Sequence, residues 1–137
     1  MSKLKHPKDW LDTVWVQPLN HCIYVVRPSS LVMFVEHMKF HKCDKHFIRD
    51  VKEMVKHVKS CPGNATYYSD DVGNSIMVLP DEYDEMATYH EALHAAVRLW
   101  HRAGAKLKLP RNDEVLTYAQ GDIVKSIKRQ VYKLKVK

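Results

Sequence analysis

The apolar residues of the chain form two kinds of pattern, and these separate predicted strands from predicted helices. Four short segments rich in β-branched and aromatic residues are predicted strands: 13–17, 21–27, 65–69 and 75–79. A short turn joins the first two strands, and the turn residues 70–74 join the last two as a hairpin. The strands therefore form two sequence-adjacent pairs.

The clearest predicted helix covers residues 44–60. Its apolar side chains recur every three or four residues on one face, while charged residues occupy the other face. Asp44 is suited to cap the N-terminus, and the helix is expected to end near Ser60, before Pro62 and Gly63. We expect the apolar face to pack in the core and the charged face to be solvated.

Three further helices are predicted, over 31–41, 81–103 and 113–130. The residues suited to cap or end them are small or flexible: Ser29 or Ser30, Gly104 and Asn112. The Val-Met-Phe-Val run inside the first of these helices also suits a strand. Residues 134–137 are expected to fray or to add a short strand.

These elements predict an α+β fold, in which a small antiparallel or mixed sheet packs against about four helices. A length of 137 residues, 45% of them hydrophobic and 28% charged, is typical of one globular domain spanning 1–137. Residues 1–12 are a polar lead-in, and 131–137 are a basic tail. No apolar run approaches the roughly 20 residues of a membrane span, and no apolar signal segment precedes the domain, so a cytoplasmic protein is expected.

The three cysteines, Cys22, Cys43 and Cys61, are odd in number and widely spaced. No CxxC pair occurs among them, so the sequence predicts neither a disulfide framework nor a zinc ribbon. We expect small buried side chains or free thiols, in agreement with a reducing compartment.

The net charge of +6 permits binding to nucleic acid or to an acidic partner without requiring it. Six positive charges fall within the last thirteen residues: Lys125, Lys128, Arg129, Lys133, Lys135 and Lys137. A solvated tail is the usual explanation of such a run, and a nucleic-acid contact is the alternative.

The predicted helix 81–103 carries the sequence H-E-x-x-H at His90, Glu91 and His94. Residues four apart lie one turn apart on the same helix face, so both imidazoles can reach a single metal ion. Neutral imidazole suits Zn²⁺, and Glu91 is then placed to take a proton from a bound water. Catalytic zinc usually has three protein ligands, so a third ligand is expected elsewhere.

The third ligand has three candidates in the sequence. Glu114 lies twenty residues beyond His94, at the start of the last predicted helix, and a turn at Gly104 would bring this helix back beside the first. Asp113 and His101 are the alternatives to Glu114.

This pattern resembles the gluzincins, which are zinc peptidases with HExxH and a downstream Glu on a second helix. The stretches HEALHAA and NDEVLTYA are similar to small metallopeptidase-like proteins of phage and bacterial genomes, and more distantly to the ImmA/IrrE-like group. The resemblance covers about residues 75–125. It implies a zincin-like domain holding one Zn²⁺ through His90, His94 and Glu114, with Glu91 as general base. It also implies that strand Ser75–Leu79 is the edge strand that holds an extended substrate.

The resemblance implies a zinc metallopeptidase that hydrolyses peptide bonds of an intracellular protein, in the host cytoplasm if a phage encodes it. The sequence departs from the thermolysin-like pattern at Tyr118, where those enzymes place an Asp that orients a zinc histidine. Asp122, one turn further on, can take that role. Candidates for stabilising a transition state are Tyr118, Tyr89, His101 and Arg98.

Three other interpretations remain open. In the first, His90 and His94 are ordinary helix residues with no ligand. In the second, zinc stabilises a non-catalytic interaction protein. In the third, the chain binds nucleic acid or an acidic partner through its basic C-terminus, for example as a phage host-takeover factor.

Overall fold

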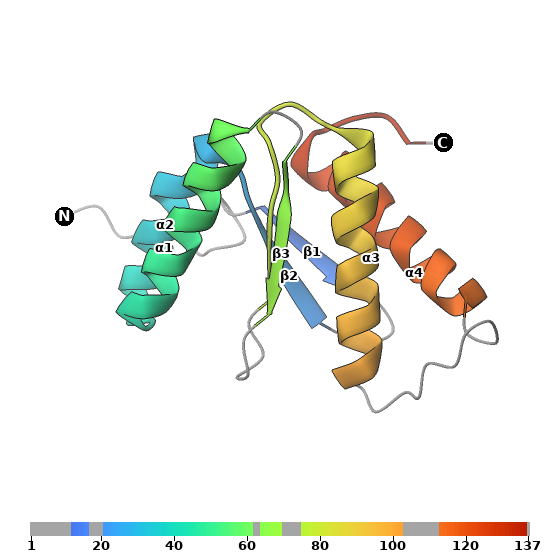
Figure 1. The fold of residues 1–137 in the computed structure, drawn as a ribbon, viewed down its shortest axis with the longest axis horizontal. Coiled ribbons are helices and arrows are strands. Elements are labelled where there is room, and N and C mark those ends of the chain that lie inside the picture. Colours follow the sequence, from blue (N-terminus) through green and yellow to red (C-terminus); the bar gives the residue numbers. More distant parts are fainter. Residues whose placement is uncertain (1–11, 17–20, 62–63, 70–74, 103–112, 137) are drawn as a thin grey trace.

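The computed structural model describes residues 12–16, 21–61, 64–69, 75–102 and 113–136 (Figure 1). The strands are β1 (Thr13–Val16), β2 (His21–Val26), β3 (Thr66–Ser69) and β4 (Ser75–Val78). The helices are α1 (Leu31–Phe40), α2 (Lys45–Ser60), α3 (Glu85–Arg102) and α4 (Asp113–Ser126). A short 3-10 turn (Pro28–Ser30) precedes α1, and a π-helical turn (Ile127–Val131) continues α4.

The four strands form one mixed sheet in the order β1-β2-β4-β3. The β1/β2 and β3/β4 pairs are antiparallel, as expected for sequence-adjacent strands, whereas β2 and β4 pair in parallel. Tyr24 opposes Thr13 on one side and Ile76 on the other, and Ile76 opposes Tyr68. The predicted α+β class with a mixed sheet and four helices is therefore confirmed.

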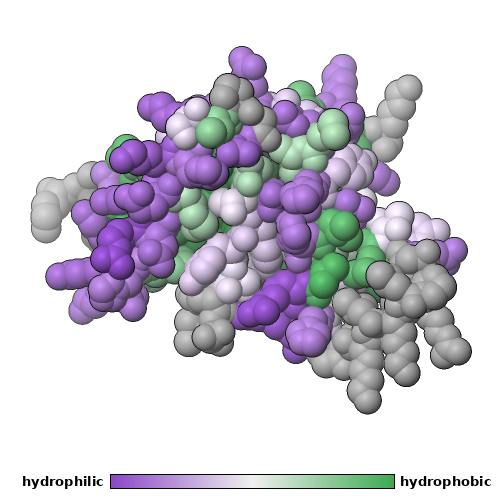
Figure 2. Space-filling view, viewed as in Figure 1, coloured by the Kyte–Doolittle hydropathy of each residue, from purple (hydrophilic) through white to green (hydrophobic). Residues whose placement is uncertain are grey.

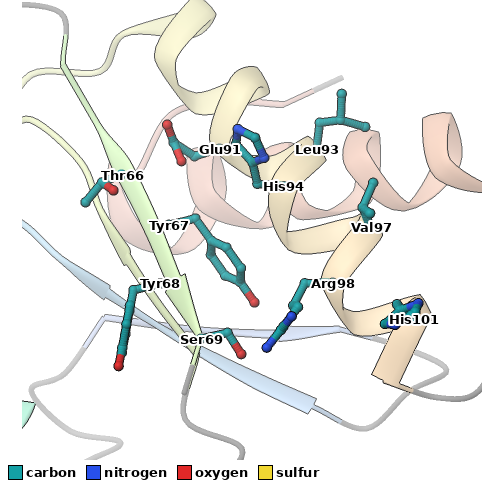
Figure 3. A pocket seen from close by; sticks show the side chains of 10 residues that line it. All are labelled: Thr66, Tyr67, Tyr68, Ser69, Glu91, Leu93, His94, Val97, Arg98 and His101. Atoms are coloured by element: carbon teal, nitrogen blue, oxygen red, sulfur yellow. The ribbon is translucent and has the colours of Figure 1, made fainter. Parts of the chain in front are cut away.

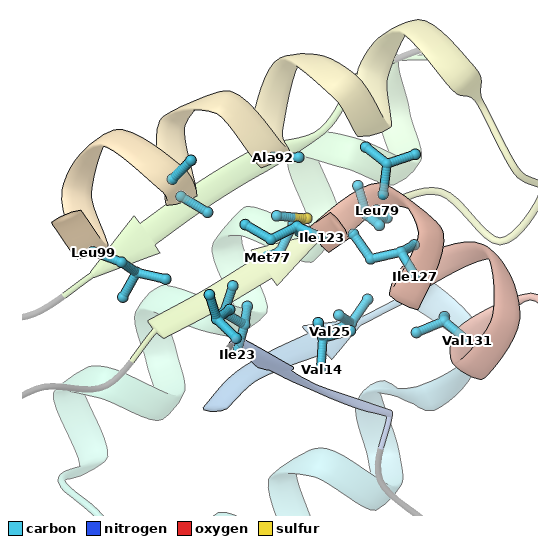
Figure 4. Close-up of a cluster of buried hydrophobic side chains, with 14 of the residues drawn as sticks. Val14, Ile23, Val25, Met77, Leu79, Ala92, Leu99, Ile123, Ile127 and Val131 are labelled. Atoms are coloured by element: carbon cyan, nitrogen blue, oxygen red, sulfur yellow. The ribbon is translucent and has the colours of Figure 1, made fainter. Parts of the chain in front are cut away.

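The helices cover both faces of the sheet, with α1 and α2 on one side and α3 and α4 on the other (Figure 1). Side chains of the central strands alternate between two apolar clusters, because successive residues of a strand point to opposite faces. Met77 and Leu79 join the cluster under α3 and α4, whereas Ile76 and Val78 join the cluster under α1 and α2 (Figure 4). Strand β4 is thus buried on both faces, which explains its uninterrupted apolar run.

The predicted cap of α2 is confirmed, and that of α1 is wrong. The Asp44 carboxylate accepts a hydrogen bond of 2.8 Å from the backbone N–H of His46. Ser30 stands at the N-cap of α1, but its hydroxyl accepts from the backbone N–H of Arg27 and caps no helical N–H. The 3-10 turn that begins at Pro28 leads directly into α1 instead.

The last helical segment ends close to its predicted end near residue 130, but its last turn has another geometry. Helix α4 is α-helical to Ser126 and continues as a π-helical turn to Val131. Residues 132–136 contain no strand, so the expected added strand does not form there. Gly104 and Asn112, predicted to flank the loop between α3 and α4, lie outside the described residues. No helix in the described part of the chain is long and apolar enough to cross a membrane.

Candidate functional site

Helix α3 brings the two histidines of the motif together on its exposed face. Their Nε2 atoms are 3.1 Å apart, and their ring centroids are 4.7 Å apart at an interplanar angle of 79°. The His90 side chain is 68% exposed, so the pair is open to solvent. Two imidazoles one turn apart thus direct the same nitrogen toward a common point.

The distance between these nitrogens fits a shared metal ion. Two nitrogens bound tetrahedrally to one zinc through bonds of about 2.0–2.1 Å lie about 3.3 Å apart. The observed 3.1 Å also suits one N–H···N hydrogen bond between neutral imidazoles. The separation of the two nitrogens is thus close to that of two ligands of one zinc ion, and it is also that of a hydrogen bond.

Glu91 lies beside the histidines on the inner side of α3. Its side chain is 8% exposed, and its Oε1 is 4.0 Å from Nε2 of His90. Burial raises the pKa of the Glu91 carboxyl above its ordinary value, against the opposing effects of His90, His94 and a hydrogen bond from the backbone N–H of Tyr67. A buried carboxyl with a raised pKa next to two imidazole nitrogens is a candidate for a proton-transferring group.

A groove of about 730 Å³ runs between α3 and strand β3 (Figure 3). Strand β3 forms one wall, from Thr66 to Ser69. Six side chains of α3 form the other wall: Glu91, Leu93, His94, Val97, Arg98 and His101. Because Glu91 and His94 lie in this wall, the motif opens directly onto the groove.

Strand β3 is the edge strand beside the groove. It pairs with β4 on one side, and its other edge faces α3, where Tyr67 donates its backbone N–H to Glu91. The expectation that Ser75–Leu79 is the edge strand is wrong, because this segment lies between β2 and β3 and is buried throughout. Because β2 pairs in parallel with β4, β3, the first strand of the β3/β4 hairpin, lies at the edge of the sheet.

A chain of hydrogen bonds connects the groove wall to the far strands. The hydroxyl groups of Tyr67 and Ser75 are 3.0 Å apart, and the Ser75 hydroxyl is 2.9 Å from Nε2 of His21. Burial lowers the pKa of His21, and the positive charge of Arg102 adds to this effect. The neutral imidazole is therefore the form that the fold prefers.

We expect acid to destabilise the protein through His21. The unfolded chain takes up a proton near the ordinary pKa of 6.5, whereas the folded chain resists it. The stabilising contribution is thus present above that pH and is lost as the pH falls toward the folded pKa. Denaturant unfolding at about pH 7.5 and about pH 5.5 should show a smaller loss of stability in His21→Gln than in wild type. Equal losses in the two proteins would contradict this expectation.

The structure places the other predicted site residues apart from the histidine pair or on its margin. Glu114 is exposed on the first turn of α4, and Tyr118 is 73% exposed one turn further on. Asp122 lines a separate pocket beside Trp15 of β1. His101 lines the same groove as His94 and is exposed.

The described residues contain no group of three or more His, Cys, Asp or Glu side chains arranged to hold a metal ion. The two histidines therefore lie close to each other, and Glu114 does not lie close to them. Helices α3 and α4 do pack together, since Gln120 donates a 2.8 Å hydrogen bond to the backbone carbonyl of Tyr89.

The groove includes residues that the sequence did not indicate as functional. The β3 wall carries Tyr67, Tyr68 and Ser69, and the Ser69 hydroxyl is buried with no hydrogen-bond partner in the described structure. The β-branched and aromatic residues of this segment predict β3, but they do not predict which strand faces α3. Arg98, named for its closeness in sequence, does project into the groove (Figure 3).

Comparisons of the chain with protein-family models, with curated proteins and with solved structures find no match. The functional argument therefore rests on the motif and on the geometry around it. The geometry defines a candidate metal site at the mouth of a groove that an edge strand borders.

Proposed function

We propose that the chain is a zinc-dependent metallopeptidase that binds an extended segment of a protein or peptide in the groove between β3 and α3. One observation carries the proposal: His90 and His94 direct their Nε2 atoms toward each other at 3.1 Å, beside the buried Glu91 and against an edge strand. A site of this composition matches the donor types and the base that zinc peptidases require.

His90 and His94 would hold the zinc ion through neutral imidazole nitrogens. Zinc would supply Lewis acidity, which polarises a carbonyl group and makes water acidic near neutral pH. Glu114 is the proposed third protein ligand, with Asp113 and His101 as alternatives, and zinc binding by variants of these residues separates them.

Glu91 would act as the general base and then as the proton donor to the leaving amine. Its burial raises its pKa, and the Tyr67 N–H orients the carboxylate. Proton transfer by a positioned carboxyl contributes about 10²- to 10⁴-fold to rate.

Strand β3 would bind the substrate backbone. The backbone groups on its edge toward α3, other than the Tyr67 N–H that is bonded to Glu91, would pair with an extended peptide, as in β-augmentation. Substrate side chains would then meet the apolar Leu93 and Val97 or the cationic Arg98. The groove thus provides both backbone and side-chain contacts.

Glu91→Gln tests the proposal directly. A mixture of unfolded proteins incubated with zinc-loaded wild type should yield defined fragments in mass spectrometry, and Glu91→Gln should reduce cleavage by at least about 100-fold while retaining zinc. Glu85→Gln, on the same helix but in an ion pair with Lys128 at 3.1 Å, is the matched control and should cleave normally.

Two outcomes would overturn the enzymatic proposal. If no protein or peptide is cleaved although one zinc is bound per chain, the chain is a zinc-stabilised interaction protein. If cleavage is equal in wild type and Glu91→Gln, the activity belongs to a contaminant or to another site.

A further inference from the structure

Helix α2 presents a row of positive charges along its whole length. The five residues of the row are spaced by four, three, four and three positions: Lys45, Arg49, Lys52, Lys56 and Lys59. At 100° per residue these positions stay within an arc of about 80°, and at 1.5 Å per residue they extend over about 21 Å. All five are exposed, and we call them the α2 cation row.

The row occupies a different face of α2 from the apolar residues, which pack in the core with Ile48, Val51 and Val55 buried. Asp50 lies about 140° around the axis from the middle of the row, and Glu53 lies about 80° from it, at the edge of the row. Among the described residues, none of the five cations forms an ion pair.

The α1–α2 corner extends the row with two more lysines around a pocket of about 570 Å³. Seven of the described residues line the pocket, and five of these are basic: Lys39, Lys42, Lys45, Ile48, Cys43, Arg49 and Lys52. None of these lining residues is acidic, and Cys43 and Ile48 contribute an apolar floor. Five like charges around one hollow repel one another, so the arrangement favours an anionic occupant.

Lys42 occupies a backbone position that normally favours glycine. Its φ is 56°, and it follows α1 in a Schellman turn closed by the Cys43 N–H to Met38 C=O bond of 2.9 Å. A lysine in the left-handed region destabilises the turn relative to glycine. Its side chain instead adds a positive charge to the pocket rim.

We propose that the α2 cation row and the corner pocket bind the phosphodiester backbone of a nucleic acid. The row is about 21 Å long, which is the axial length of about six base pairs at 3.4 Å each. A small anion would need only the pocket. An anionic membrane is disfavoured, because the apolar face of α2 is buried in the core and cannot insert.

This surface is separate from the histidine pair of α3 and from the basic C-terminus. It lies on the α1/α2 side of the sheet, whereas the histidine pair and the C-terminus lie on the α3/α4 side (Figure 1). Hydrophilic side chains cover α2 in the space-filling view (Figure 2). The proposal therefore does not depend on the proposed peptidase activity, nor on the basic tail.

Fluorescence anisotropy tests the proposal with three labelled probes. These are a 20-base-pair duplex DNA and single-stranded DNA and RNA of the same sequence. Binding by wild type should weaken with a log–log salt slope of about −4 to −6 on the duplex, as expected for five to seven phosphate contacts. The double variant Arg49→Gln/Lys52→Gln should bind at least about tenfold more weakly and should have a slope smaller by about two. The three probes also show which form of nucleic acid is preferred.

The matched control is Lys125→Gln/Arg129→Gln, which removes the same charge from exposed residues of the other side. It should change the affinity by less than about threefold. Equal weakening by both double variants, or greater weakening by the control, would overturn the proposal. So would the absence of binding at about 50 mM salt, or equally strong competition by polyglutamate, which would indicate an acidic protein partner.

Lys42→Gly separates loss of charge from loss of structure. Because glycine suits the left-handed turn, this variant should unfold at a higher temperature while binding nucleic acid more weakly. Weaker binding in a more stable protein cannot be explained by unfolding. Unchanged affinity would overturn the assignment of the corner pocket to this site.

Discussion

Replacing His94 by Ala is expected to abolish zinc binding at the proposed site. Wild type should contain about one zinc per chain, and the loss of one imidazole ligand should weaken zinc binding by more than about 100-fold. Inductively coupled plasma mass spectrometry after dialysis against apo-buffer measures this stoichiometry. Zinc should also raise the unfolding temperature of wild type and leave that of His94→Ala unchanged, because a ligand stabilises only the state that binds it.

The control for this experiment is His46→Ala, an exposed histidine near the start of α2. It should retain zinc fully. Zinc-free wild type whose stability does not respond to added zinc would contradict the metal site, and the two histidines would then be ordinary surface residues joined by one hydrogen bond.

The same measurement identifies the third ligand. Glu114→Ala should reduce the zinc affinity as strongly as His94→Ala if Glu114 completes the site, and His101→Ala should have little effect. The reverse result would transfer the role to His101, which already lines the groove. Equal retention in both variants would leave Asp113 as the remaining candidate.

Replacing Phe34 by Ala is expected to lower the free energy of unfolding by about 3–5 kcal/mol. The Phe34 side chain is 1% exposed in the cluster under α1 and α2, and its ring meets that of Tyr24 edge-on at a centroid distance of 6.0 Å. Alanine would leave a cavity at this position. The central strand cannot shift to fill the cavity, because it packs against helices on both faces. Urea unfolding followed by circular dichroism measures the difference.

Val32→Ala on the same helix is the matched control, since Val32 is 70% exposed and alanine suits a helix. It should change the free energy of unfolding by less than about 0.5 kcal/mol. Because Phe34 lies on the face of the sheet opposite α3, the folded Phe34→Ala variant should still bind zinc. A loss of zinc at temperatures where the variant is folded would mean that the two faces are coupled.

Most of the secondary structure follows from short-range patterns. Their content of β-branched and aromatic residues predicts all four strands, and the apolar stripe of α2 with its Asp44 cap predicts that helix almost to the residue. The convergence of His90 and His94 is likewise a local property, because any regular helix places residues four apart on one face. Errors occur at helix ends, where Ser30 and the π-helical turn after α4 depend on neighbouring elements.

The composition of the groove could not be predicted in the same way. Strand β3 becomes the edge because β4 pairs in parallel with β2, and this pairing joins residues distant in sequence, such as Tyr24 and Ile76. The contact of Tyr67 with Glu91 follows from this order alone. The third zinc ligand is a long-range question of the same kind, since it depends on how α4 lies against α3.

Local sequence patterns therefore account for the elements and for the paired imidazoles of α3, because each depends on residues within a few positions of one another. The order of the strands, the edge that borders the groove and the separation of the α2 cation row from the histidine pair arise only in the folded chain. They depend on contacts between residues distant in sequence, which are selected by burying both apolar faces of one small sheet at once.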